Sequence, residues 1–161
     1  NNEEKEMYKV WVKVKKTVGE NERIMWITFF PIPCYSFPGN GAVTEPTYNL
    51  GPDHLNIIYG TPDQAKASLQ KRKLNYFVIN PHNLLESGLV YSNLFHPSEI
   101  AKHFSVSFQD QDTYVLTWNG LKDTTPIPQQ FLGTYEKNQK RNAGRFGMIY
   151  KSKAKVYELL N

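Results

Sequence analysis

Two short apolar runs constrain the fold of this chain more than any other feature of its sequence. The first, over residues 23–30, reads Arg-Ile-Met-Trp-Ile-Thr-Phe-Phe, and the second, over residues 75–80, reads Asn-Tyr-Phe-Val-Ile-Asn. Both are short and rich in β-branched and aromatic residues, a composition typical of strands that are buried on both faces. With 161 residues, of which 40% are hydrophobic, the chain is expected to form a single domain with a real core.

Helical patterns surround these two runs. The clearest helix start is Thr61-Pro62-Asp63, because threonine can cap the helix, proline suits its first position and aspartate complements its dipole. This helix is predicted to end near Arg72. The other predicted elements are helices over residues 4–18, 97–104, 129–140 and 146–160, a weaker strand over 55–59, and strands over 106–108 and 113–118 joined by a hairpin.

The order of these elements predicts the fold class. Strands that alternate with helices are typical of α/β proteins with a parallel or mixed sheet. We expect an α/β, three-layer, Rossmann-like module with a mixed, partly parallel sheet and a C-terminal β-hairpin plus helices. The single domain should cover residues 1–161, with an N-terminal helix in 1–19, an α/β core in 23–118 and C-terminal helices in 128–161.

A long connection separates the first strand from the elements that follow. Residues 31–53 read PIPCYSFPGNGAVTEPTYNLGPD, with no lysine or arginine, and loops longer than about 12–15 residues are usually functional or disordered. This one is too aromatic for a solvated tether. We therefore expect a contact surface beyond the carboxyl end of a buried strand, where open α/β sheets bind ligands. Its candidate contact residues are Tyr35, Phe37, Glu45, Tyr48, Asp53 and His54.

The sequence predicts no catalytic residue, no metal site and no cofactor. The only cysteine, Cys34, cannot be paired with a histidine from the sequence, although a nucleophilic cysteine needs a nearby base. The histidines at positions 54, 82, 96 and 103 show no metal-binding spacing.

One acidic pair has two interpretations. Asp110 and Asp112 could hold a divalent cation, as Asp-x-Asp pairs do in some soluble glycosyltransferases, and the chain would then be a small metal-dependent enzyme. The interpretation that we favour is a hairpin turn, in which aspartate is common because it forms local hydrogen bonds.

Charge is mildly positive and gathers at both ends of the chain. The formal net charge is +4, and the cations concentrate before residue 17 and after residue 133. Such patches suit an anionic lipid surface, or serve only solubility. No nucleic-acid-binding signature accompanies them, so we expect no nucleic acid partner. No apolar run reaches the length of a membrane span. The chain also lacks an initial methionine, and we expect it to be part of a longer protein.

Several segments, in this order, resemble the water-soluble C-terminal region of large bacterial polytopic membrane glycosyltransferases, in the class similar to dolichyl-phosphate-mannose protein mannosyltransferases. The helix-to-strand stretch from Ala65 to Ile79 matches a recurrent pattern of that class. The segments that carry the resemblance are residues 23–31, 34–39, 58–69, 74–79, 94–104 and 113–118.

This resemblance implies a non-catalytic soluble domain on the extracytoplasmic, periplasmic face of the bacterial inner membrane. Its partners would be the membrane domain of the same polypeptide, a polyprenyl-phosphate sugar or its acceptor, and an anionic lipid surface. The catalytic acidic residues of the class lie in a part that this chain lacks, so none is transferred. The alternative is a free-standing extracellular or effector-like module that binds a protein through the same loop.

Overall fold

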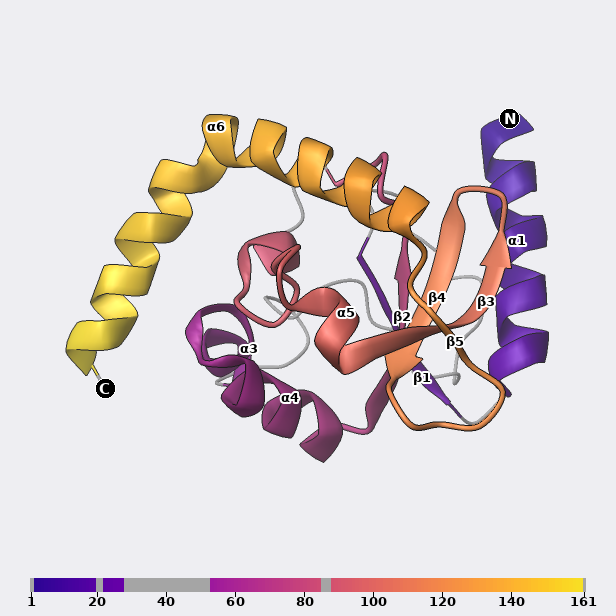
Figure 1. The fold of residues 1–161 in the computed structure, drawn as a ribbon, viewed down its shortest axis with the longest axis horizontal. Coiled ribbons are helices and arrows are strands. Elements are labelled where there is room, and N and C mark those ends of the chain that lie inside the picture. The colour runs from indigo at the N-terminus through magenta and orange to yellow at the C-terminus, as the bar shows by residue number, and fades with distance from the viewer. Residues whose placement is uncertain (1, 20–21, 28–52, 85–87, 161) are drawn as a thin grey trace.

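The computed structural model describes residues 2–19, 22–27, 53–84 and 88–160, which form an open five-stranded mixed sheet with helices around it (Figure 1). The strands of this described part are β1 (Arg23–Trp26), β2 (Leu74–Ile79), β3 (Phe104–Asp110), β4 (Thr113–Trp118) and β5 (Thr125–Pro126). Their order across the sheet is β1-β2-β4-β3-β5. Only β1 and β2 pair in parallel, and the other neighbours are antiparallel. The predicted α/β class with a mixed, partly parallel sheet is confirmed.

Both predicted buried strands are present and lie side by side. The run at 75–80 is β2, and the described part of the run at 23–30 is β1, which continues for one more hydrogen bond from Ile27 N–H to the Val78 carbonyl, 2.8 Å. Side chains of β2 alternate between the two faces of the sheet, yet Phe77, Val78 and Ile79 are all fully buried. The sheet is therefore covered on both faces at this point, as the unbroken apolar run predicted.

The connection from β1 to β2 ends in two short helices, α3 (His54–Tyr59) and α4 (Pro62–Lys71). The weak strand expected over 55–59 is wrong, because these residues form α3, whose Ile57 packs with Ala65 and Leu69 of α4. Gly60 makes the tight turn between the helices. A Cβ on Gly60 would lie 2.5 Å from the Asn56 carbonyl oxygen, so only glycine fits there.

The start of α4 is confirmed in atomic detail. The Thr61 hydroxyl accepts a hydrogen bond from the Gln64 N–H (3.2 Å), and the Gln64 side chain accepts one from the Thr61 N–H (2.9 Å). This reciprocal pair is a capping box, and it satisfies two donors that a helix start leaves unpaired. The helix ends at Lys71, close to the predicted end.

The predicted hairpin is also confirmed, with a longer first strand than expected. Strand β3 begins at Phe104 directly after the short helix α5 (Ile100–His103), and Gln111 turns the chain into β4 with φ of +53°. The sequence missed β5, two residues that pair with Ser105 and Val106 where a chain break was expected.

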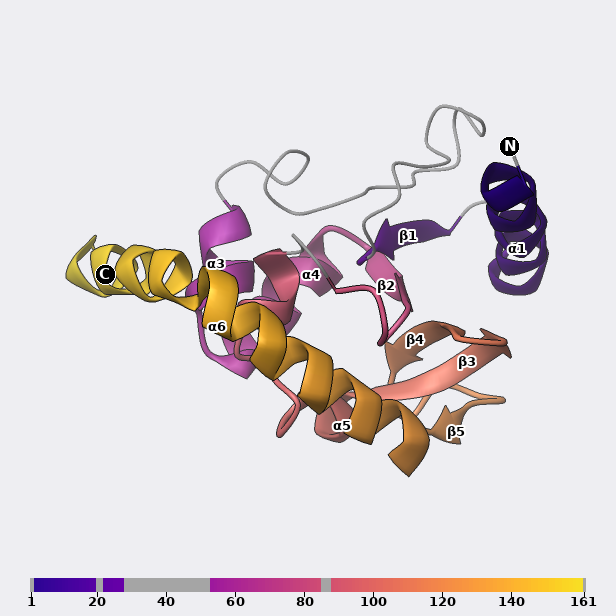
Figure 2. The same cartoon turned by 90° about the horizontal axis from the view of Figure 1, so that it is seen from above.

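Two clusters of buried side chains cover the two faces of the sheet. The major cluster joins the sheet to α3, α4, α5 and α6 and contains the aromatic rings of Phe77, Phe95, Phe104, Trp118 and Tyr135. Among the described residues, the minor cluster joins the sheet to α1 (Asn2–Val18) and consists of Trp11, Val14, Val18, Ile24, Trp26, Val78 and Val115. Figure 2 shows α1 and α6 on opposite sides of the sheet.

The C-terminal helix α6 (Gln129–Leu160) is one helix of 32 residues, whereas the sequence predicted two. Gly144 lies inside it, in the expected break, but a glycine there costs only about 1 kcal/mol relative to alanine. Phe131 and Tyr135 bury the first half of α6 against the major cluster. Among the described residues, we find no helix whose length and apolar character would let it cross a membrane.

Candidate functional site

The candidate site lies at the carboxyl ends of the parallel strands β1 and β2. The backbone bond between Ile27 and Val78 holds these ends together, and residues 28–52 begin directly after Ile27. Ligands of open α/β sheets bind beyond the carboxyl ends of parallel strands, because loops from neighbouring strands meet there. Four of the predicted contact residues, Tyr35, Phe37, Glu45 and Tyr48, lie outside the residues that the structure describes.

Asp53 lies at the other end of the sheet. Its Oδ2 accepts a 2.7 Å hydrogen bond from Arg72 Nε at the end of α4, and that bond lowers the pKa of the Asp53 carboxyl. The Arg72 carbonyl in turn accepts a hydrogen bond from the Arg23 guanidinium at the start of β1. Asp53 therefore helps to fasten the start of α3 to the amino ends of β1 and β2. His54 begins α3, and its side chain is outside the described part.

Polar side chains border the carboxyl end of β2. The Asn80 Oδ1 accepts a 2.9 Å hydrogen bond from the His82 N–H. This bond closes a turn that places His82 beside the β3–β4 hairpin. There the His82 Nε2 lies 3.7 Å from Asp112 Oδ1, and both side chains are more than half exposed. We call Asn80, His82 and Asp112 the carboxyl-edge rim.

Helix α6 fixes the base of this rim. Asn138 Nδ2 donates a hydrogen bond of 3.1 Å to the Pro81 carbonyl, and the same amide group donates to the Thr134 carbonyl one turn earlier in α6. The hydrogen bond from α6 thus fixes the turn after β2, while the His82 side chain stays exposed. Sequence reasoning missed the His82–Asp112 pair, and the signal that could have found it is a histidine two residues after a buried strand.

The two aspartates of the hairpin do not act as one pair. Asp110 Oδ2 accepts a 2.9 Å hydrogen bond from Lys13 Nζ of α1, whereas Asp112 faces His82. Each carboxylate is thus beside a different partner that is distant in the sequence. Among the residues that the structure describes, we find no group of three or more side chains able to hold a metal ion.

His96 and His103 have local roles beside α5. The His96 Nδ1 accepts a 3.1 Å hydrogen bond from the Ser98 N–H and lies 2.7 Å from the Ser98 hydroxyl, which caps the turn before α5. The His103 carbonyl accepts the Asn119 N–H, 3.0 Å. The helix predicted over 97–104 is observed only at Ile100–His103, with Glu99 at its N-cap and no side-chain cap hydrogen bond, so His96 lies in the turn before the helix.

In chemical terms, the rim can recognise a polar ligand. Histidine and aspartate side chains together offer donors and acceptors for hydroxyl groups, and an ion pair forms when His82 is protonated. Comparison of this chain with protein-family models, with curated proteins and with solved structures found no significant match.

Proposed function

We propose that this chain is a non-catalytic, soluble module of a membrane glycosyltransferase that uses a lipid-phosphate-linked sugar. Residues 31–53 would contact the sugar acceptor, the donor or the membrane domain of the same polypeptide. The module would lie on the extracytoplasmic, periplasmic face of the bacterial inner membrane. This proposal extends the sequence resemblance stated above.

One structural observation supports it most. Residues 28–52 begin at the carboxyl ends of the only parallel strand pair of the described sheet, beside the carboxyl-edge rim. This is the place where an open α/β sheet offers a ligand site. Aromatic side chains suit the apolar faces of sugar rings, and the rim suits their hydroxyls. The loop residues Tyr35, Phe37 and Tyr48 would supply the first kind of contact and His82 with Asp112 the second.

We also propose that the fold is Rossmann-like, with three layers. The support is the unit formed by β1, the α3–α4 helices and β2, in which a helical connection joins two adjacent parallel strands. Helices also pack on both faces of the sheet.

The proposal is tested in the full-length protein with the Tyr35→Ala/Tyr48→Ala double variant. The control is Tyr8→Ala, which removes an exposed tyrosine of α1. We expect sugar transfer, or assembly of the membrane protein, to fall in the double variant and to persist in the control. Unchanged transfer and assembly in the double variant would refute the role of the loop.

The coding sequence upstream of Asn1 separates this proposal from its alternative. A run of hydrophobic spans directly before Asn1 supports the membrane glycosyltransferase. A cleaved signal peptide or an initiator methionine there would instead favour a free-standing protein-binding module, and the proposed function would be wrong.

A further inference from the structure

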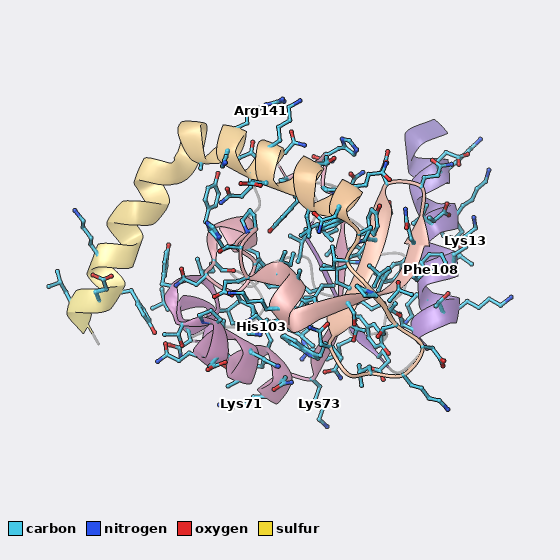
Figure 3. The ribbon with its side chains drawn as sticks, viewed as in Figure 1. Lys13, Lys71, Lys73, His103, Phe108 and Arg141 are labelled. Carbon is cyan, nitrogen blue, oxygen red and sulfur yellow. The ribbon has the colours of Figure 1, made fainter. Side chains whose placement is uncertain are left out.

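Helix α6 presents a charged outward face above the carboxyl edge of the sheet. Its inward face is fixed by the buried Phe131 and Tyr135 and by the hydrogen bond from Asn138 to the Pro81 carbonyl. The opposite side of the same turns is exposed, and in Figure 3 the Arg141 side chain points away from the domain. We define the α6 outward face by its exposed residues Gly133, Glu136, Lys137, Lys140, Arg141 and Gly144.

Positive charge on this face is only partly neutralised. Lys140 forms an exposed ion pair of 3.0 Å with Glu136. For Lys137 and Arg141, the described residues supply no ion pair. These two cations are four residues apart, so they lie one above the other on the helix, where like charges destabilise it. An external anion would remove that repulsion.

Along the helix, the two cations of the outward face are flanked by glycines, which carry no side chain. A Cβ added to Gly133 or to Gly144 would meet nothing within 4 Å, so no packing inside the described domain calls for glycine there. Without side chains at these positions, Lys137 and Arg141 stand clear of their neighbours and can reach a flat surface.

Helix α1 has four exposed lysines, Lys5, Lys9, Lys13 and Lys16, and two of them form ion pairs. Lys9 pairs with Glu6 at 3.1 Å and Lys13 pairs with Asp110 at 2.9 Å. By sequence, α6 has seven cations and two acids, whereas α1 has five cations and three acids. By sequence, the larger net positive charge is therefore on α6.

We propose that the α6 outward face binds the head groups of an anionic lipid surface through Lys137, Lys140 and Arg141. A convex helix with protruding cations complements a flat, negatively charged surface, and each lysine or arginine near such a surface adds to the affinity. The contact would place the carboxyl edge, with the start of residues 28–52, next to the membrane. The choice of a membrane as partner rests on the proposed function, although the test below does not.

The test measures binding of the 161-residue chain to vesicles by co-sedimentation. One set of vesicles is phosphatidylcholine alone, and the other contains phosphatidylglycerol as well. We expect binding only to the second set, with loss of binding at high salt. The Lys137→Gln/Arg141→Gln variant should bind on the order of tenfold more weakly, since two surface cations are removed. Lys5→Gln/Lys16→Gln removes the same charge from exposed positions of α1 and should bind nearly as well as the parent chain.

Three results would overturn the inference: no binding of the parent chain to phosphatidylglycerol vesicles, equal loss in the two variants, or binding to duplex DNA that depends on Lys137 and Arg141 when vesicles are not bound. Thermal unfolding of each variant confirms that it is folded.

If vesicles bind as expected but the Tyr35→Ala/Tyr48→Ala variant transfers sugar normally, only the proposed function fails. If transfer falls in that variant but vesicles do not bind, only this inference fails.

Discussion

The two faces of the sheet are covered in different ways. On one face, the major cluster contains side chains of four helices and of the strands, and at its centre Phe77 contacts the rings of Phe95, Phe104 and Trp118. On the other face, α1 is the one helix of the described residues in the minor cluster, with Trp11 packed on Trp26 at 5.1 Å between ring centroids and an ion pair from Lys13 to Asp110 of the hairpin. Because of this difference, we expect α1 to unfold locally while the rest of the described domain stays folded.

The largest effect is expected on the major cluster. The Phe77 ring lies 5.2 to 5.5 Å from the rings of Phe95, Phe104 and Trp118. Phe77→Ala should lower the free energy of unfolding by about 4–5 kcal/mol, because it leaves a cavity among rings that cannot close it. Urea unfolding followed by circular dichroism measures this. Phe77→Leu, which keeps more of the volume, should lose less, and an alanine variant that loses under about 2 kcal/mol would contradict the described centre of the core.

The next effect separates the two faces directly. Trp11→Ala should lower the free energy of unfolding by about 3 kcal/mol, at the low end for such a change, because the ring joins α1 to the sheet and does not join the strands to one another. Hydrogen exchange should show faster exchange in α1 and slow exchange in β2 and β4. Equal loss of protection in α1 and in these strands would mean that the two faces unfold as one unit.

A smaller effect is expected where α6 joins the major cluster. The buried Tyr135 hydroxyl donates a hydrogen bond to the Phe95 carbonyl, so Tyr135→Phe should cost about 1–2 kcal/mol by leaving that oxygen unpaired. Burial raises the pKa of Tyr135 above its ordinary value.

This shift predicts a pH dependence with a definite sign. Above the ordinary tyrosine pKa of about 10, Tyr135 loses its proton in the unfolded chain but keeps it in the folded chain. Its contribution to stability is therefore complete below that pH and declines as the pH rises further. Chemical unfolding at a series of alkaline pH values should show a shallower decline in Tyr135→Phe than in the parent chain, and equal slopes would argue against burial of this hydroxyl.

The smallest effect is expected on the α1 side. Lys13 and Asp110 form an exposed ion pair, which is worth about 0.2–1 kcal/mol in a double-mutant cycle of Lys13→Ala and Asp110→Asn. The coupling energy should shrink as salt is added. A coupling well above about 1 kcal/mol would show that α1 is held more firmly than its packing suggests.

Local signals in the sequence predicted much of this fold. Thr61, Pro62 and Gln64 fix the start of α4 through contacts within four residues, and the apolar run at 75–80 corresponds to a strand buried on both faces. The hairpin between β3 and β4 follows from its turn residues. Each of these features depends on neighbours in the chain, which a sequence shows directly.

Features that depend on distant partners were not predictable in this way. Residues 55–59 have the β-branched and aromatic composition of a strand, but packing of Ile57 against α4 decides for a helix. The placement of β4 between β2 and β3 and the pairing of His82 with Asp112 require segments far apart in the chain to meet. At the candidate site, the sequence drew attention to the loop, whereas the rim became visible only when the strand ends were placed side by side.

Helix α6 has a mechanical consequence. A helix of 32 residues is about 48 Å long, and its two ends touch different parts of the molecule. In its first half, Asn138 bonds the Pro81 carbonyl in the turn after β2 and Tyr135 bonds the Phe95 carbonyl, and near its end the Tyr157 hydroxyl donates a 2.7 Å hydrogen bond to Asn56 Oδ1 of α3. Between these two contacts α6 is bent, so that its second half turns toward α3 (Figure 1). The bent helix links the carboxyl edge of the sheet to the helix that follows residues 28–52, and a change in the bend would disturb the contacts at both places.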